Sequence, residues 1–265
     1  MIAGSSPNLD EGIHMAATMR AQRFYADSKT IAVEDVPIPD PGPGEVLVKV
    51  AFCGICHSDL SLINGTFPSQ LPVVTQGHEA AGTIAKLGPG VTGWAEGDRV
   101  VVAAGKPCLD CPNCRRGDMS NCLRIRLMAF AYDGAWAEYT VAQAFGLTRV
   151  PDNVPLEQAA ILADAVSTPY GAVVRTAKVG IGESVGVWGV GGLGTHIIQL
   201  ARLVQCHAVA KIDGGRHRQS LWFGFTSEAG CGPRKREGRQ GFPCRPPLLP
   251  TRRIRRRGGC PPRRC

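Results

Sequence analysis

Four cysteines in one short segment constrain this chain more than any other feature. Cys108, Cys111, Cys114 and Cys122 are spaced as C-x2-C-x2-C-x7-C. Thiolates this close together can bind one tetrahedral zinc ion, because Zn2+ favours sulfur ligands and four-coordination. A site with sulfur at all four positions has no place for a substrate, so we expect a structural metal. The alternative is a pair of disulfides, which the lack of a secretory signal before the cluster disfavours.

The bulk composition is that of a globular chain. Hydrophobic residues make up 44% of its 265 residues, and no apolar run approaches the roughly 20 residues that span a bilayer. Residues 1–18 lack the basic start and apolar core of a signal peptide, so we expect a flexible extension there. Together with the thiols, which we expect to be reduced, this predicts a cytoplasmic protein without membrane partners.

Charge divides the chain into two parts. Residues 1–213 carry a net charge of −4 and residues 214–265 a net charge of +12. The second part contains 13 Arg, 9 Gly and 7 Pro without a sustained apolar period, which predicts a disordered basic tail. Its run at 252–257 has an alternative interpretation as a nucleic-acid arm. Because no aromatic residues are interleaved with these arginines, we expect no specific nucleic-acid partner.

Short strands dominate the sequence pattern between residues 20 and 150. Runs rich in β-branched residues occur at 46–50, 80–84 and 99–102, and Pro and Gly turns separate them. Many short strands with such turns predict an antiparallel, partly open β-barrel.

The pattern changes after Pro151 to mixed α and β structure. It predicts helices at 155–163, 167–178 and 195–204, and strands at 184–188 and 207–212. The last helix and the two strands form a βαβ unit.

A glycine motif lies between the first of these strands and its helix. In Gly189-x-Gly191-x-x-Gly194, glycines allow a tight turn and let the backbone approach a pyrophosphate at the helix N-terminus. Asp213 follows the second strand, where a carboxylate accepts the ribose hydroxyls of NAD and repels the 2′-phosphate of NADP. The alternative is an ordinary turn aspartate before two glycines.

Two further clusters carry metal-binding side chains. Cys56 and His78 lie in separate segments, and a thiolate and an imidazole suit a catalytic zinc that keeps an open position. Asp59 and Glu79 can act as outer carboxylates or as exchanging ligands. Cys53 reads as a small buried core residue, and His78 taken alone could be structural.

These motifs together resemble the zinc-containing medium-chain alcohol dehydrogenase family from about Arg20 to Asp213. The resemblance implies a GroES-like catalytic domain at 19–165 and a partial Rossmann NAD-binding domain at 166–213. It also implies two zinc ions, NAD, and a small alcohol or carbonyl substrate. Family members form homo-oligomers through a Rossmann edge that this sequence lacks, so the oligomeric state stays open.

The same resemblance assigns roles to particular residues. It implies Cys56 and His78 as catalytic zinc ligands, and Asp164 as the third, whose alternative is to cap the following helix. Ser58 would take the substrate's hydroxyl proton.

Two further positions keep alternatives. His57 would touch the cofactor phosphate or relay the proton, and its alternative is an ordinary solvated histidine. Trp136 aligns with a pocket-lining aromatic residue or serves as core packing.

The family pattern ends after Asp213. We hypothesise that the reading frame was lost near residues 205–220 or that an unrelated end was fused there. Because a parallel strand needs neighbours and covering helices, we expect exposed apolar side chains in the βαβ unit, namely Val185, Val187, Ile197, Ile198 and Leu200.

Two function hypotheses follow. The first is a zinc- and NAD-dependent oxidoreductase of the alcohol dehydrogenase type, with impaired turnover in this chain. The second is a catalytically inactive zinc-binding GroES-like module. A zinc-free quinone-reductase-like protein is weaker, because such relatives lack the ligands found here.

Overall fold

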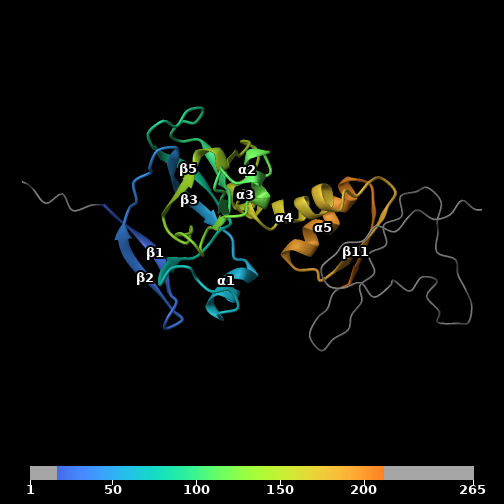
Figure 1. The fold of residues 1–265 in the computed structure, drawn as a ribbon, viewed down its shortest axis with the longest axis horizontal. Helices are drawn as coiled ribbons and strands as arrows, with labels where there is room; N and C mark the ends of the chain where they lie inside the picture. The colour runs from blue at the N-terminus through green and yellow to red at the C-terminus, as the bar shows by residue number, and fades with distance from the viewer. Residues whose placement is uncertain (1–16, 212–265) are drawn as a thin grey trace, which may run out of the picture. The chain divides into compact units, whose positions relative to one another are not determined.

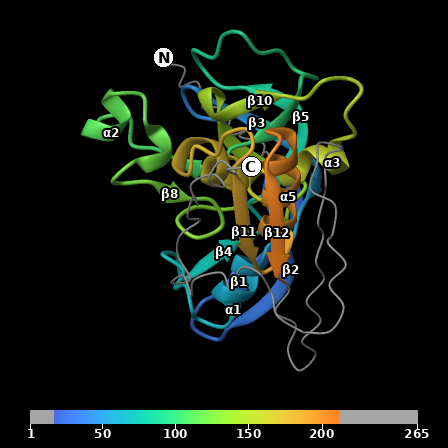
Figure 2. The same ribbon diagram turned by 90° about the vertical axis from the view of Figure 1, so that its right-hand side faces the viewer.

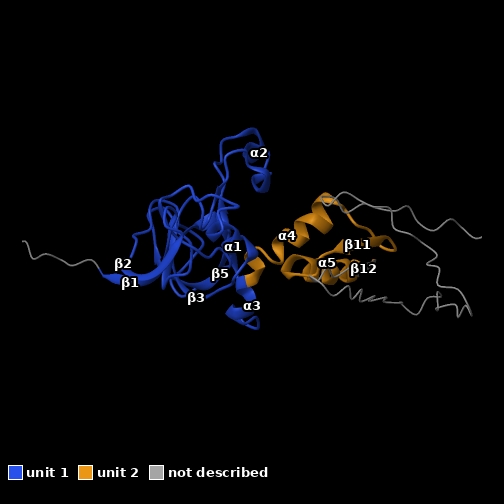
Figure 3. Ribbon diagram, turned by 90° about the horizontal axis from the view of Figure 1, so that it is seen from below, with its two compact units in different colours: residues 1–160 blue, residues 161–265 orange. Residues whose placement is uncertain are grey.

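The described part of the chain, residues 17–211 of this computed structural model, forms two compact units. They divide between Ala160 and Ile161 (Figure 3). The domain limits predicted at residues 18, 165 and 213 stay predictions. The basic tail and Asp213 fall outside the described residues. So does the predicted N-terminal extension, except for its residues 17 and 18.

Besides a short two-stranded sheet, the first unit contains two antiparallel sheets (Figure 1). One has the strand order β2-β1-β4, with β1 at Thr18–Tyr25, β2 at Thr30–Pro37 and β4 at Val73–Thr75. The other has the order β10-β6-β5-β3-β9. Its strands are β3 (Glu45–Cys53), β5 (Ala80–Leu87), β6 (Arg99–Val102), β9 (Tyr139–Gln143) and β10 (Leu147–Arg149).

The larger sheet carries the main core of this unit. β-Branched side chains on β3 and β6, which the pleat directs to one face, are fully buried: Val46, Val48, Val100 and Val102. A single antiparallel bridge between Ala21 and Ala137 joins the two sheets. The described strands do not close into a ring, so the predicted partly open barrel is confirmed.

Short elements complete the first unit. They are α1 (His57–Ile63), the β7–β8 hairpin (Gly105–Lys106 with Arg126–Leu127), α2 (Pro112–Arg115), η1 (Met119–Asn121), η2 (Ala144–Gly146) and α3 (Leu156–Ala160). The helix predicted at 155–163 is present as α3 followed by the 3-10 turn η3 (Ile161–Ala163).

The second unit is a helical segment followed by a βαβ unit. Its elements are α4 (Ser167–Tyr170), the π-helix η4 (Gly171–Thr176), β11 (Ser184–Trp188), α5 (Gly192–Leu203) and β12 (His207–Lys211). Strands β11 and β12 pair in parallel and lie side by side in Figure 2, which confirms the predicted βαβ unit. Helix α5 begins three residues earlier than predicted, because the glycine turn supplies its N-cap residue Gly191.

The expectation of exposed apolar side chains in this unit is wrong for its first strand. Val185 and Val187 are 2% and 5% exposed. Ile197, Ile198 and Leu200 pack against the same cluster, which also includes Val173 of η4. One face of the two-stranded sheet is therefore buried, because the π-helix adds apolar contacts to those of α5.

Across residues 17–211, no helix combines the length and apolarity needed to cross a bilayer.

Candidate functional site

The cysteine quartet is assembled as a metal site. The Sγ atoms of Cys111 and Cys114 are 3.5 Å apart, and those of Cys108–Cys114 and Cys111–Cys122 are 4.0 Å apart. Zinc–sulfur bonds of about 2.3 Å in a tetrahedron place sulfurs about 3.8 Å apart, whereas a disulfide requires about 2.05 Å. All seven cysteines in the described residues are free. The geometry therefore fits a tetrahedral cation, and the disulfide alternative fails.

The surroundings shift the pKa values of two of the four thiols in opposite directions. Backbone N–H groups of Cys114 and then Leu123 lower the pKa of Cys111 to about 6. Burial, reinforced by hydrogen bonding from the neighbouring thiols, raises the pKa of Cys114 to about 12. Four thiolates cannot share so small a volume without a compensating cation. A dication satisfies this requirement, and Arg124, which contacts Cys108 and Asp110, adds positive charge at the rim.

Cys56 opens helix α1. It is the N-cap residue, with extended backbone angles (φ −107°, ψ 155°), and it is half-buried. Its backbone N–H donates to Asp59 Oδ2 at 2.9 Å, an arrangement in which the third helical residue satisfies the N-cap amide. The helix start therefore fixes the orientation of the thiol.

His78 lies in the connection from β4 to β5. The preceding Gly77 has φ 88°, and a Cβ there would lie 2.4 Å from Trp136 Cδ1. Only glycine fits both the backbone angle and the contact. This close turn directs the buried His78 ring toward α1, where Nε2 lies 3.4 Å from Ser58 Oγ.

Asp59 supports both of these side chains. Its carboxylate is 1% exposed, with Oδ1 at 3.7 Å from His78 Nδ1 and Oδ2 on the Cys56 amide. A carboxylate behind a metal-binding imidazole fixes the ring and raises its basicity. Of the two outer carboxylates that the sequence suggested, Asp59 lies beside the imidazole, at a separation longer than a hydrogen bond.

Asp164 is half-buried after η3, and its Oδ1 accepts a 2.5 Å hydrogen bond from Thr168 Oγ1. The N-cap residue of α4 is Val166, so Asp164 does not hold that position. One ligand atom from each of Cys56, His78 and Asp164 lies within 4.8 Å of the other two. Zinc with sulfur, nitrogen and oxygen ligands places them about 3.3 to 3.8 Å apart, so this donor set suits zinc and leaves the fourth position of a tetrahedron open.

The other residues that the sequence singled out have separate surroundings. Glu79 is buried, its carbonyl accepts the Gly54 N–H at 2.8 Å, and its carboxylate is not among the three grouped ligand atoms. His57 is exposed at the first position of α1. Burial raises the pKa of the Cys53 thiol to about 12, which agrees with its interpretation as a neutral core side chain.

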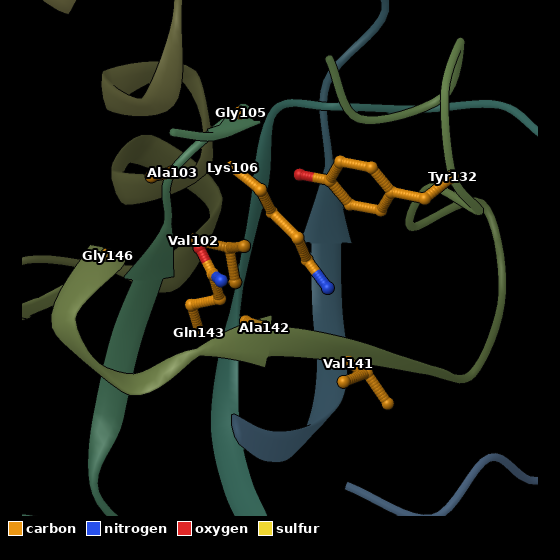
Figure 4. Close-up of a pocket in the computed structure, with 9 residues that line it drawn as sticks. All are labelled: Val102, Ala103, Gly105, Lys106, Tyr132, Val141, Ala142, Gln143 and Gly146. Carbon is orange, nitrogen blue, oxygen red and sulfur yellow. The ribbon is translucent and has the colours of Figure 1, made fainter. Parts of the chain in front are cut away.

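Trp136 is half-buried and lines a hollow of about 380 Å³ that also includes Phe52 and Val33. Its indole N–H donates to Gly54 O at 3.3 Å. Trp136 therefore contacts the backbone before Cys56 and also lines the hollow. A much smaller cavity lies beside Lys106, Tyr132 and Gln143 (Figure 4). It holds about 10 Å³, the space of a single water molecule, which excludes a substrate.

The glycine motif forms the turn between β11 and α5. Gly189 follows the strand and Gly191 caps the helix. A Cβ on Gly194 would lie 1.9 Å from Gly189 O, so the helix can approach the turn only with glycine at this position. This is the close helix–strand packing that the third glycine of a dinucleotide-binding turn provides.

Sequence reasoning missed a pair of glutamines behind the metal-binding segments. Gln76, at the end of an apolar run, is fully buried and bonds both Gln22 and the backbone of Asp59. The available signal was an amide in a run that otherwise reads as a buried strand.

Comparison with known proteins shows what the chain is similar to. Residues 42–152 match the alcohol dehydrogenase GroES-like domain. An alcohol dehydrogenase of Schizosaccharomyces pombe is 37% identical over 208 residues, which cover 77% of this chain and 59% of that protein.

Two solved structures are similar as well. Acetophenone reductase from Geotrichum candidum in complex with NAD has a TM-score of 0.68 at 34% identity, covering 78% of this chain and 59% of its own. Cobalt- and zinc-bound alcohol dehydrogenase from Pyrobaculum aerophilum has a TM-score of 0.68 at 31% identity, covering 73% and 59%.

The chain thus spans about three fifths of the length of the relatives it matches. Within that span its fold is similar to theirs, with a TM-score of 0.68 to both solved structures. Over the part that they share, this chain is therefore similar in sequence and in fold to zinc-containing alcohol dehydrogenases.

Proposed function

We propose that this chain is built for hydride transfer between a small alcohol or carbonyl compound and NAD at a zinc centre. The observation that carries the proposal is the meeting of one thiol, one imidazole and one carboxylate, from Cys56, His78 and Asp164. Such a set differs from the all-sulfur quartet because it leaves one position of a tetrahedral ion open. When bound there, zinc polarises the substrate oxygen and lowers its pKa.

The chain's own residues handle the proton. Ser58 Oγ lies beside His78 and accepts the proton of the substrate hydroxyl as its own proton passes outward. His57, exposed at the start of α1, is the next carrier toward solvent or a contact for the cofactor phosphate. Asp59 places a carboxylate 3.7 Å from His78 Nδ1, on the other side of the ring from Ser58.

The glycine turn of the second unit holds the dinucleotide. N–H groups at the start of α5 stabilise the pyrophosphate, with Gly189, Gly191 and Gly194 shaping the approach. NAD is proposed over NADP on the strength of Asp213, which lies outside the described residues.

The alternative function is an inactive zinc-binding module. Both functions predict two zinc ions per chain, and only the dehydrogenase predicts NADH binding and turnover. The test is to purify the full chain, count zinc by elemental analysis, titrate NADH by fluorescence, and assay NAD reduction with a panel of alcohols. Two zinc ions with no response to NADH select the module, and a single zinc ion contradicts the catalytic centre.

Location and assembly stay predictions of this proposal. A cytoplasmic location agrees with the seven free thiols of the described residues, since free thiols persist in reducing compartments. The absence of a specific nucleic-acid partner and the oligomeric state both depend on parts of the chain outside 17–211.

A further inference from the structure

A fully buried amide lies between the two segments that carry Cys56 and His78. Gln76 is 0% exposed and stands two residues before His78. Its Nε2 donates to the carbonyl oxygen of Asp59 at 3.1 Å, within the first turn of α1. This one side chain therefore spans from the histidine segment to the helix that Cys56 opens.

A second glutamine fixes the first. Gln22 of β1 donates from Nε2 to Gln76 Oε1 at 2.9 Å, and its own Oε1 accepts the Gln76 backbone N–H at 3.2 Å. β1 pairs with β4, and Figure 2 shows both strands together with α1. The Gln76 amide is thus held at both ends and cannot rotate without breaking a buried hydrogen bond.

Trp136 closes the same network through its backbone. Gln22 N–H donates to Trp136 O at 2.8 Å, and Trp136 N–H donates to Gln76 O at 2.9 Å. Its indole N–H reaches Gly54 O, two residues before Cys56. Both sides of the cysteine, Gly54 before it and Asp59 after it, are therefore tied to the strand end that leads to His78.

Burying the Gln76 amide and half-burying that of Gln22 has a cost that an apolar pair would avoid. A polar group taken from water loses free energy unless its hydrogen bonds are replaced, and the gain from replacing them is small. An apolar residue at position 76 would fill the space but set no fixed distance between the segments. A fully bonded amide sets that distance, because its bonds are directional.

We propose that Gln22 and Gln76 form an amide clamp that sets the separation of Cys56 and His78 for metal binding. The clamp rests on the proposed zinc centre. Gln76 is a positioning residue in it, acting through Asp59 and the α1 backbone rather than through contact with metal or substrate. Gln22 acts one step further away, by holding Gln76.

The test replaces one of the glutamines at a time with methionine, which has a similar length and no hydrogen-bonding amide. Gln76→Met removes the bond to Asp59, and Gln22→Met leaves that bond in place. Gln143→Met is the matched control, because Gln143 lies on β9 beside the small cavity of Figure 4 and bonds none of these residues. Each full-length chain is loaded with Co2+, whose visible spectrum reports ligand geometry, and its affinity is measured against a chelator.

Gln76→Met should weaken binding of the second metal about 10- to 100-fold and shift the cobalt spectrum. Gln22→Met should show a smaller change in the same direction, and Gln143→Met none. The quartet site should be unchanged in all three. Unaltered spectrum and affinity in Gln76→Met, even with a lower melting temperature, would show the amide to be merely structural and overturn the clamp.

Hydrogen exchange separates this proposal from that of the zinc centre. In metal-free chains, peptides covering α1 (His57–Ile63) should exchange faster in Gln76→Met than in the native chain or Gln143→Met. If the native chain binds only one metal, the proposed function fails, and α1 exchange still decides the clamp. Equal α1 exchange in the native and Gln76→Met chains overturns it.

Discussion

Two cysteines three residues apart, Cys53 and Cys56, have opposite surroundings, and the difference is testable at the scale of single residues. Burial raises the pKa of Cys53 to about 12, so its thiol stays protonated at neutral pH and is a poor ligand. Cys56 opens α1 within reach of His78. Cys53→Ala should retain two zinc ions per chain, whereas Cys56→Ala should retain one.

Elemental analysis of the two purified variants checks this prediction. Alkylation adds a pH readout: in the metal-free native fold, Cys53 should stay unmodified by iodoacetamide at pH 8, because thiolate forms there only as the pH approaches about 12. If Cys53→Ala lost a zinc ion and Cys56→Ala did not, Cys53 would be the metal ligand and the prediction would be wrong.

Glu45 gives a pH-dependent contribution to stability. Burial raises its pKa, but the Lys106 ammonium, 2.8 Å away, and the Gly42 N–H together outweigh burial, and the net pKa is lowered. Because the folded pKa lies below the unfolded value, the ion pair stabilises the fold above the unfolded pKa and loses its effect as the pH falls through the folded pKa. Glu45→Gln should lower the free energy of unfolding by about 0.5 to 1 kcal/mol at pH 7.

Urea unfolding at pH 7 and below pH 4 checks the sign. The gap between the native chain and Glu45→Gln should narrow at the acidic pH, where the native carboxylate also becomes protonated. A gap that stays constant across this range would mean that packing, not charge, accounts for the difference.

At the scale of elements, the turn between β11 and α5 tolerates one glycine replacement and not another. Gly194→Ala places a methyl group 1.9 Å from Gly189 O, so α5 must move away from the turn. Overpacking of this kind costs about 1 to 3 kcal/mol. At Gly192 the nearest atom, Ala165 Cβ, is 3.9 Å from an added Cβ, and alanine favours the helix.

Gly194→Ala should therefore lower the melting temperature of the second unit and abolish the NADH fluorescence response, and Gly192→Ala should keep the melting temperature. Thermal scans with and without NADH measure both effects. Equal behaviour of the two variants would mean that the close approach at Gly194 does not limit the packing of α5.

Local sequence pattern predicted the elements better than it predicted their contacts. The strands near 46–50, 80–84 and 99–102 and the βαβ unit are all present, because apolar period and glycine punctuation are local properties. The π-helix at 171–176 was expected to be an ordinary helix, since its apolar spacing suits either form. Burial of Val185 and Val187 was missed because their covering residue Val173 comes from that helix.

The candidate site divides in the same way. Closely spaced motifs, the quartet and the glycine turn, could be predicted because few residues separate the groups that must meet. The prediction of Asp164 as a third zinc ligand came from family resemblance rather than from spacing. Contacts such as Gln22–Gln76, which are 54 residues apart in sequence, could not be predicted, since one chain does not reveal which distant strands pair.

At the scale of the whole molecule, metal and nucleotide should stabilise different units. The quartet, Cys56 and His78 lie in residues 17–160, and the glycine turn lies in residues 161–211. Asp164, the proposed third ligand of the second metal, lies at the start of the second unit, before β11 and α5. A ligand at 100 times its Kd stabilises the unit that binds it by about 2.7 kcal/mol. Removing zinc should therefore speed hydrogen exchange mainly in the first unit, around residues 105–127 and α1, and adding NADH should slow exchange around β11 and α5.

Exchange mass spectrometry of the full chain with chelator, with zinc and with zinc plus NADH measures both units at once. Protection of β11 and α5 by zinc alone, without NADH, would contradict this division, because it would mean that the metals also hold the second unit in its fold.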